Sequence, residues 1–469
     1  MARPLLTLAL LTTACRPGPA HVAAPAASPA PVAAQPTASP SLALPDLPPP
    51  PAVATMLSRV RPDSVRAHVD ALVAFGTRHT LSQDAPDRGI AAARAWLATQ
   101  MTGYGSRLVV TLDRHPIAPD GRRIDRHVDV VNVVATLPGS MPEAAGRHYY
   151  VIGHYDSRGS DPMDANGDAP GANDDASGVA VVLELARVLA DVQLDATVVF
   201  MATAGEEQGL LGARAHAQAA TAAGVDIRGV LSNDIVGDPT APDGSRDDRT
   251  VRVFSEGIPS GIDDETLQQI RSLSATSDSP SRQLARAVDL VGQWHALGVV
   301  PRLVFRHDRF LRGGDHTAFN AVGVPAIRFT EVGEHYDRQH QDPRTEGERQ
   351  FGDLPQYVDA DYLAGVARLN LAALVHLANA PSTPSHAEIV ATSLTTDTTL
   401  RWQASPEPDV TGYEVVWRAT TDPTWGHVQD VGKHTQVTLP LHKDDWLFGI
   451  RAYDSDGYRS PAAFPDVVR

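Results

Sequence analysis

The sequence predicts two folded domains: an α/β domain with a mainly parallel sheet sandwiched by helices, and a smaller all-β sandwich at its C-terminal end. Between residues 56 and 380, apolar strand-like runs alternate with amphipathic helical runs, a pattern typical of a parallel sheet covered by helices. Residues 385–469 contain only short strand-like runs separated by turn residues, as in a β-sandwich. The length of 469 residues also exceeds one ordinary domain, and the Pro-Ser-Thr-Pro segment at 381–384 marks the boundary.

The N-terminal residues 1–15 have the features of an export signal. Arg3 precedes an apolar run at 5–11, which is shorter than the roughly 20 residues that a membrane-spanning helix needs. Cys15, the only cysteine, resembles the lipidated cysteine of bacterial lipoproteins, although Thr12 stands where a leucine is usual. We therefore expect an exported protein, either a periplasmic or cell-surface lipoprotein tethered to a membrane through Cys15, or a secreted protein cleaved nearby.

Residues 16–55 are mostly Ala, Pro, Ser and Val without periodicity, which predicts an extended linker between the signal and the first domain. The formal net charge of −16 at pH 7 argues against nucleic acid or an anionic membrane surface as a partner. The sequence gives no indication of the oligomeric state.

The α/β domain opens with two helical patterns and continues with alternating strands and helices. Apolar residues at helical spacing predict helices at 63–75, 87–101 and 176–190. Strands are expected at 107–112, 128–137, 196–202 and 324–330, and two further apolar strands end at His154 and just before Asp234. A tight Gly/Pro loop precedes the helix at 176–190, with Asp175 or Ser177 as its N-cap.

The C-terminal domain is expected to form strands at 388–393, 398–402, 412–418, 435–439 and 446–453. The segments 399–402, 412–418 and 448–453 resemble a fibronectin type III module. We expect Trp402 and Tyr453 to be core aromatics rather than parts of a ligand site.

Two adjacent acids, Glu206 and Glu207, follow the apolar strand at 196–202 and precede a glycine-rich turn. Adjacent side chains at the end of a strand diverge, so one acid can bind a metal while its neighbour faces a water molecule. This division of roles is what metal-assisted hydrolysis requires.

Other potential metal ligands lie at the ends of further strands. His154 ends one strand, and Asp156, two residues on, can accept the second ring N–H of that histidine. Asp174 precedes the helix at 176–190, and Asp234 ends another strand. A late histidine follows the strand at 324–330. Such a mixed carboxylate–imidazole set suits one or two divalent ions, with zinc the best match.

Five segments in this order resemble the zinc aminopeptidases and carboxypeptidases of metallopeptidase family 28. They are His-Tyr-Asp-Ser, Pro-Gly-Ala-Asn-Asp-Asp-Ala-Ser-Gly, Glu-Glu-Gln-Gly-Leu-Leu-Gly-Ala, Asn-Asp-Ile-Val-Gly, and Gly-Asp-His-Thr-Ala-Phe followed by Gly-Val-Pro-Ala-Ile. The resemblance spans residues 56–380 and implies a catalytic domain with the zinc exopeptidase fold and two Zn²⁺ ions per chain.

The resemblance also implies a role for each residue. Asp174 would bridge the two ions, His154 and Asp234 would hold one, and Glu207 and a late histidine the other. Glu206 would be the general base, and Asp156 would orient His154. For the late histidine we choose His340, which has Asp342 two residues on, with His335 as the alternative. The sequence after His340 departs from the family, which usually has Thr or Ser there.

The predicted function is an exported di-zinc exopeptidase with peptide substrates, namely an aminopeptidase that uses Glu206 to activate a metal-bound water. His316 or Tyr336 are candidates for stabilising the tetrahedral oxyanion. Three alternatives stay open: a carboxypeptidase, a glutaminyl-cyclase-like enzyme of the same family, and a non-catalytic binding protein on the same fold.

Overall fold

The computed structural model describes residues 42–43, 49–83, 86–392 and 395–468, all of which belong to one compact unit, Thr37–Arg469. The predicted export signal, Cys15 and most of the predicted linker lie outside the described residues. Within the described residues, no helix is both long and apolar enough to cross a membrane.

The first domain is built on an eight-stranded mixed sheet in the order β2-β3-β5-β4-β6-β9-β7-β8. The central pairs β5/β4, β4/β6 and β6/β9 are parallel, whereas β2/β3, β3/β5 and β7/β9 are antiparallel. The expected mainly parallel sheet is therefore confirmed at its centre. The strands are β2 (Val109–Ile117), β3 (Val128–Leu137), β4 (Arg147–His154), β5 (Thr197–Thr203), β6 (Asp226–Asn233), β7 (Thr250–Ser255), β8 (Val300–Val304) and β9 (Ala326–Thr330).

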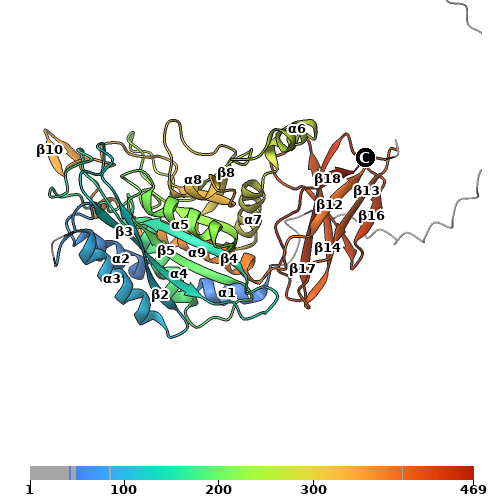
Figure 1. Cartoon of the computed structure of the whole chain (residues 1–469), viewed down its shortest axis with the longest axis horizontal. Coiled ribbons are helices and arrows are strands. Elements are labelled where there is room, and N and C mark those ends of the chain that lie inside the picture. Colours follow the sequence, from blue (N-terminus) through green and yellow to red (C-terminus); the bar gives the residue numbers. More distant parts are fainter. Residues whose placement is uncertain (1–41, 44–48, 84–85, 393–394, 469) are drawn as a thin grey trace, which may run out of the picture. The chain divides into compact units, whose positions relative to one another are not determined.

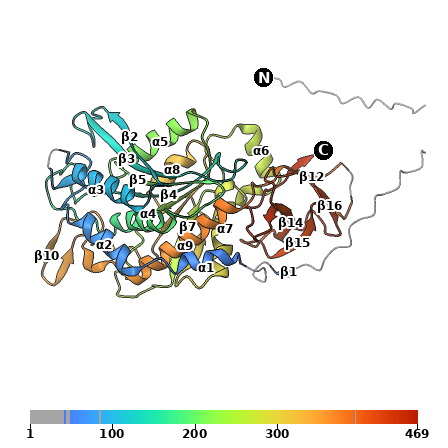
Figure 2. The ribbon, with the colours of Figure 1, turned by 90° about the horizontal axis from the view of Figure 1, so that it is seen from below.

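Helices cover both faces of this sheet (Figures 1 and 2). A large apolar core joins one face to helices that include α2, α3, α4, α7 and α9, and a smaller core joins the other face to α5 and α8. The helices are α1 (Pro51–Leu57), α2 (Pro62–Val73), α3 (Gly89–Tyr104), α4 (Ala176–Leu189), α5 (Leu211–Ala222), α6 (Asp264–Ser272), α7 (Pro280–Trp294), α8 (Asp315–Asn320) and α9 (Ala360–Asn379).

Helix α4 packs in the middle of the larger core, which explains its nearly continuous apolar sequence. Of the two residues considered as its N-cap, Asp175 fills this position and accepts the backbone N–H of Gly178 at 2.9 Å. The adjacent Asp174 is thus left free of the helix terminus. After β9 the chain forms a loop and a short hairpin, β10 (Arg344–Glu346) and β11 (Arg349–Phe351), before it enters α9.

The C-terminal domain consists of two four-stranded sheets, β1-β15-β14-β17 and β16-β13-β12-β18. Their facing side chains share one apolar core, in which Trp402 meets Tyr413 edge to face, whereas Tyr453 is only half buried. The strands are β12 (Ser385–Val390), β13 (Thr398–Gln403), β14 (Val410–Ala419), β15 (His427–Gly432), β16 (Gln436–Leu439), β17 (Trp446–Asp454) and β18 (Asp466–Val468).

Two segments of the predicted linker at 16–55 have regular structure instead. Leu42–Ala43 forms strand β1, which pairs antiparallel with β15, and helix α1 begins at Pro51. Proline is favoured in the first turn of a helix because its φ angle already suits it, and Val53 is buried in the larger core. An Ala/Pro-rich composition does not reveal such contacts, because they depend on distant parts of the chain.

Buried ion pairs connect the sandwich to the α/β domain. Asp278, just before α7, binds Arg286 of α7 at 3.0 Å and Arg418 of β14 at 2.8 Å. Arg147 of β4 likewise binds Glu407, which precedes β14, at 3.2 Å. All five side chains are almost entirely buried, so these contacts are shielded from water.

Candidate metal centre

The carboxyl ends of three neighbouring strands supply most of the site. His154 is the last residue of β4, Glu206 and Glu207 follow β5, and Asp234 follows β6. Because β5, β4 and β6 are adjacent and parallel, their carboxyl ends meet at one edge of the sheet, where sites in such sheets form. The loop before α4 brings Asp174 to the same edge.

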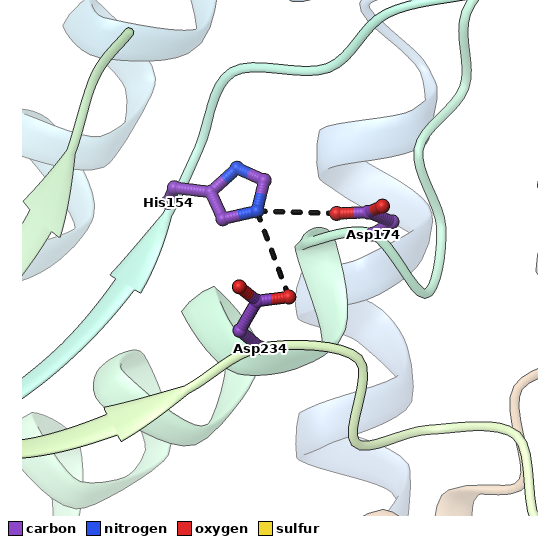
Figure 3. A group of neighbouring side chains, drawn as sticks. All are labelled: His154, Asp174 and Asp234. Atoms are coloured by element: carbon purple, nitrogen blue, oxygen red, sulfur yellow. Dashed lines mark ion pairs between the residues drawn. The ribbon is translucent and has the colours of Figure 1, made fainter. Parts of the chain in front are cut away.

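One group of ligand atoms comprises His154, Asp174 and Asp234 (Figure 3). Nε2 of His154 lies 3.1 Å from Oδ1 of Asp174 and 3.9 Å from Oδ1 of Asp234. All three side chains are buried. Arg328, fully buried on β9, holds Asp234 by placing Nη2 2.8 Å from its Oδ1.

A second group comprises Asp174, Glu207 and His340. Nε2 of His340 lies 3.1 Å from Oδ2 of Asp174 and 3.0 Å from Oε1 of Glu207. Asp174 thus belongs to both groups, with one carboxylate oxygen directed to each. Among the described residues, the alternative histidine, His335, belongs to neither group.

The donor atoms fit a bound cation. Nε2 of His154 and Oε1 of Glu207 are buried without a hydrogen-bond partner among the described residues, although both lie close to other ligand atoms. Leaving buried polar atoms unpaired is costly, and a metal ion between the side chains would satisfy both. Imidazole nitrogen and carboxylate oxygen are also ligands that zinc accepts.

The electrostatics of the two ligand groups also favour a bound cation. Although burial opposes it, the carboxylates around His154, with Asp175 foremost, raise the pKa of that ring well above its ordinary value. Glu207 and Asp174 likewise overcome burial and raise the pKa of His340 to about 10. The site therefore attracts positive charge strongly, and a divalent ion can supply it in place of protons.

Asp156 contacts both His154 and the turn that carries the two glutamates. Its carboxylate accepts the backbone N–H groups of Glu206 at 3.2 Å and Glu207 at 3.1 Å. Nδ1 of His154 is closer to the backbone carbonyl oxygen of Asp156, at 3.2 Å, than to its carboxylate, at 3.6 Å. The fully buried Asp156 thus fixes the turn that carries both glutamates, and its main chain orients the histidine.

Glu206 is only partly buried and lines an open cavity of about 480 Å³ next to both groups. The surrounding protein partly excludes water from this carboxyl, and this desolvation raises its pKa well above the ordinary value. The negative charges of Asp234 and Glu207 raise the pKa further. The cavity is lined by Arg123, Arg158, Asp174, Glu206, Glu207, Gly209, Leu210, Arg214, Asp234, Arg309, Leu311, Arg312, Gly313 and His340. Neither oxyanion candidate, His316 or Tyr336, is among these described lining residues.

Strained backbone conformations gather around this cavity. Leu210, Leu311 and His340 line it with positive φ angles of 60°, 55° and 51°, and Ile235, next to Asp234, has a φ of 61°. Non-glycine residues adopt this region at a cost, and such residues concentrate at functional sites.

Several residues that support the site were not predicted from the sequence. Arg158 donates from Nε to Oε2 of Glu207 at 3.0 Å, and its Nη2 lies 2.7 Å from Nδ1 of His340. Asp353 accepts the backbone N–H of Asp174 at 2.7 Å, and burial raises the pKa of this acid to about 7. Arg328 had a visible signal, since it is a lone charge within the apolar strand at 324–330. No pattern in the sequence pointed to Asp353 or Arg158.

A buried carboxylate–imidazole cluster with a glutamate at the cavity surface is an arrangement that suits metal-dependent hydrolysis. The model of Peptidase family M28 matches residues 132–354, which include every residue of the two ligand groups. A "Probable zinc metalloprotease" of Leptosphaeria maculans is 44% identical over 88% of this chain and 96% of its own length. A protein of the same name from Pyricularia oryzae is 46% identical over 87% of this chain and 83% of its own. The chain therefore belongs to peptidase family M28.

Solved structures also resemble the chain, at low sequence identity. The aminopeptidase from Aneurinibacillus sp. strain AM-1 is 15% identical, with a TM-score of 0.48 over 69% of this chain and 95% of that one. Porphyromonas gingivalis glutaminyl cyclase is 19% identical, with a TM-score of 0.46 over 67% of this chain and 98% of that one.

Proposed function

We propose that this protein is a zinc-dependent aminopeptidase that removes N-terminal residues from peptides. The observation that carries the proposal is the shared position of Asp174 in two ligand groups, with Glu206 beside them at the wall of an open cavity. Membership of peptidase family M28 and the zinc metalloprotease names of the relatives support it.

The residues of the first group, His154, Asp174 and Asp234, would hold one Zn²⁺ ion. Asp174, Glu207 and His340 would hold a second. When bound, such ions lower the pKa of a coordinated water and polarise the scissile carbonyl.

Glu206 is the base in this proposal. Its carboxylate accepts a proton from the attacking water and later returns it to the leaving amine of the peptide. The two steps require a carboxyl that reaches the reacting water and binds no metal, and Glu206 lines the cavity without belonging to either ligand group of the described residues. Asp156 holds the backbone of Glu206 in place, so that the carboxyl stays aimed at the cavity.

A peptide panel with metal analysis tests the proposal. Purified protein should contain zinc and release the first residue from peptides with a free N-terminus, whether or not the C-terminus is amidated. N-acetylation should abolish cleavage. Cleavage lost on C-amidation instead would identify a carboxypeptidase, and cyclisation of an N-terminal glutamine would identify a cyclase. Zinc binding without any of these reactions would leave a non-catalytic binding protein.

Export is a second proposal, which rests on residues 1–15 of the sequence. Mass spectrometry of the N-terminus of the mature protein tests it. A diacylglyceryl group on Cys15 would establish the membrane tether, whereas cleavage without a lipid would indicate secretion.

A further inference from the structure

The cavity beside Glu206 is rich in arginine. Lys and Arg together make up 40 of 469 residues, yet five of the fourteen cavity-lining residues are arginine. They come from four separate segments of the chain: the loop between β2 and β3, the loop after β4, helix α5, and the loop between β8 and α8. Because the protein as a whole is acidic, this clustering of positive charge suggests that the cavity binds something negative.

Two of the five arginines already have charged partners. Arg158 binds Glu207 and His340 of the second ligand group. Arg309 is largely buried and binds Asp308 at 2.9 Å and Glu334 at 2.7 Å. These two side chains therefore stabilise the wall of the cavity through their ion pairs.

The other three have donor groups to spare. The exposed Arg123 gives one N–H to the backbone carbonyl oxygen of Glu207, and Arg312 gives one to the neutral Gln339 at 3.0 Å. Arg312 also has Glu334 3.7 Å away, but that acid is shared with Arg309. Arg214, exposed in the first turn of α5, has no ion pair or side-chain hydrogen bond with any described residue.

The position of Arg214 gives a second reason to expect a negative charge in the cavity. The N-terminal end of a helix is positive, so a cation in the first turn of α5 destabilises the helix unless another charge compensates. The four acids that line the cavity, Asp174, Glu206, Glu207 and Asp234, do not serve this purpose, because three are metal-ligand candidates and the fourth is the proposed base. An anionic ligand would provide the missing charge.

We propose that Arg123, Arg214 and Arg312 bind a carboxylate of the substrate, so that the cavity selects peptides with a carboxylate near the scissile bond. Guanidinium groups match carboxylates in shape and charge, and their hydrogen bonds to them are charge-assisted. The carboxylate comes from an Asp or Glu side chain or from the C-terminus of a very short peptide. Leu210 and Leu311 give the same cavity an apolar part for the aliphatic portion of the residue. The selectivity in hydrolysis rests on the proposed function, whereas carboxylate binding does not.

Binding to the zinc-loaded Glu206→Gln variant, measured by calorimetry, tests the inference without turnover. The probes are Glu-Ala-Ala, its neutral isostere Gln-Ala-Ala, and the C-amidated form of each. We expect a peptide with the recognised carboxylate to bind about tenfold more tightly than its neutral counterpart. Adding Arg214→Gln and Arg312→Gln together should remove this preference and leave binding of the neutral, amidated peptide within about threefold. Arg271→Gln, on an exposed arginine of α6 that does not line the cavity, is the matched control and should keep the preference.

The arms of the experiment separate the possible results. A preference for Glu over Gln assigns the carboxylate to a side chain, and a preference lost on amidation assigns it to the C-terminus; either supports the inference. Equal binding of all four peptides overturns it, as does a preference that survives in the double arginine variant with unchanged zinc content and melting temperature. Carboxylate-selective binding together with a wild-type protein that hydrolyses no peptide would keep the inference and refute the proposed aminopeptidase.

Discussion

Oδ2 of Asp174 lies 3.1 Å from Nε2 of His340, and the other oxygen of the same carboxylate lies 3.1 Å from Nε2 of His154. One side chain therefore faces both histidines, each with a different oxygen. This geometry is suited to a carboxylate that bridges two ions, as the sequence resemblance implies for Asp174.

If Asp174 bridges two ions, the metal content should depend on this acid more than on any other ligand. Asp174→Ala should lose both zinc ions because it removes a ligand from each group. Glu207→Ala should weaken mainly one site, since this residue belongs to one group only. Zinc analysis of the dialysed proteins measures the difference, with Asp168→Ala, an exposed acid, as the control. Two ions retained by Asp174→Ala would exclude the bridge.

The two late histidines should respond differently to substitution. His340→Ala removes a ligand candidate that lies 3.0 Å from Glu207 and should release about one zinc per chain, with a steep fall in activity. His335→Ala should keep both ions, because His335 is in neither ligand group of the described residues. The opposite result would transfer the ligand role to His335.

Glu206 should be needed for turnover but not for metal binding. Glu206→Gln keeps the size of the side chain but cannot accept a proton, so we expect kcat to fall about 100-fold or more. Zinc content should stay at the wild-type level. The exposed Glu265→Gln serves as the control and should leave both quantities unchanged. Wild-type turnover by Glu206→Gln would remove this residue from the role of base.

Asp278 should contribute strongly to stability. Its buried carboxylate is the common partner of Arg286 and Arg418, so Asp278→Asn leaves two buried cations without their counter-charge. We expect the free energy of unfolding to fall by about 3–5 kcal/mol in urea denaturation. The exposed pair Arg246–Asp248 offers a comparison, because Asp248→Asn should cost less than about 1 kcal/mol. Equal effects of the two substitutions would show that the contact between the domains is weak.

His376 should make the protein less stable in mild acid. Burial lowers the pKa of this ring in α9 to about 3, below the value of about 6.5 expected in the unfolded chain. Between these values the unfolded state binds the extra proton. The contribution of His376 to the free energy of unfolding is therefore unaffected by pH above about pH 6.5, and it falls by up to about 1.4 kcal/mol per pH unit below that value. His376→Gln cannot titrate, and its unfolding free energy should decline less between pH 7 and pH 5. An unchanged decline would show that other groups control the acid sensitivity.

The sequence anticipated much of the fold because its elements follow local patterns. The predicted helix at 176–190 and the predicted strand at 128–137 match α4 and β3 within one residue, since their apolar spacing reflects the geometry of the elements themselves. Strands β1 and β15 were missed, because Leu42–Ala43 and His427–Gly432 carry little apolar periodicity and depend on each other for pairing.

For the metal centre, the sequence by itself determined which residues end the central strands: His154, the Glu206–Glu207 pair and Asp234 are polar groups directly after apolar runs. The sequence favoured His340 over His335 through the acid two residues after it, but only the tertiary structure placed His340 against Asp174, because the loop that carries both has no periodic pattern. The same holds for the arginines of the cavity, which come from segments far apart in the chain. Local sequence encodes the periodicity of helices and strands, whereas the meeting of loop side chains is set by long-range packing.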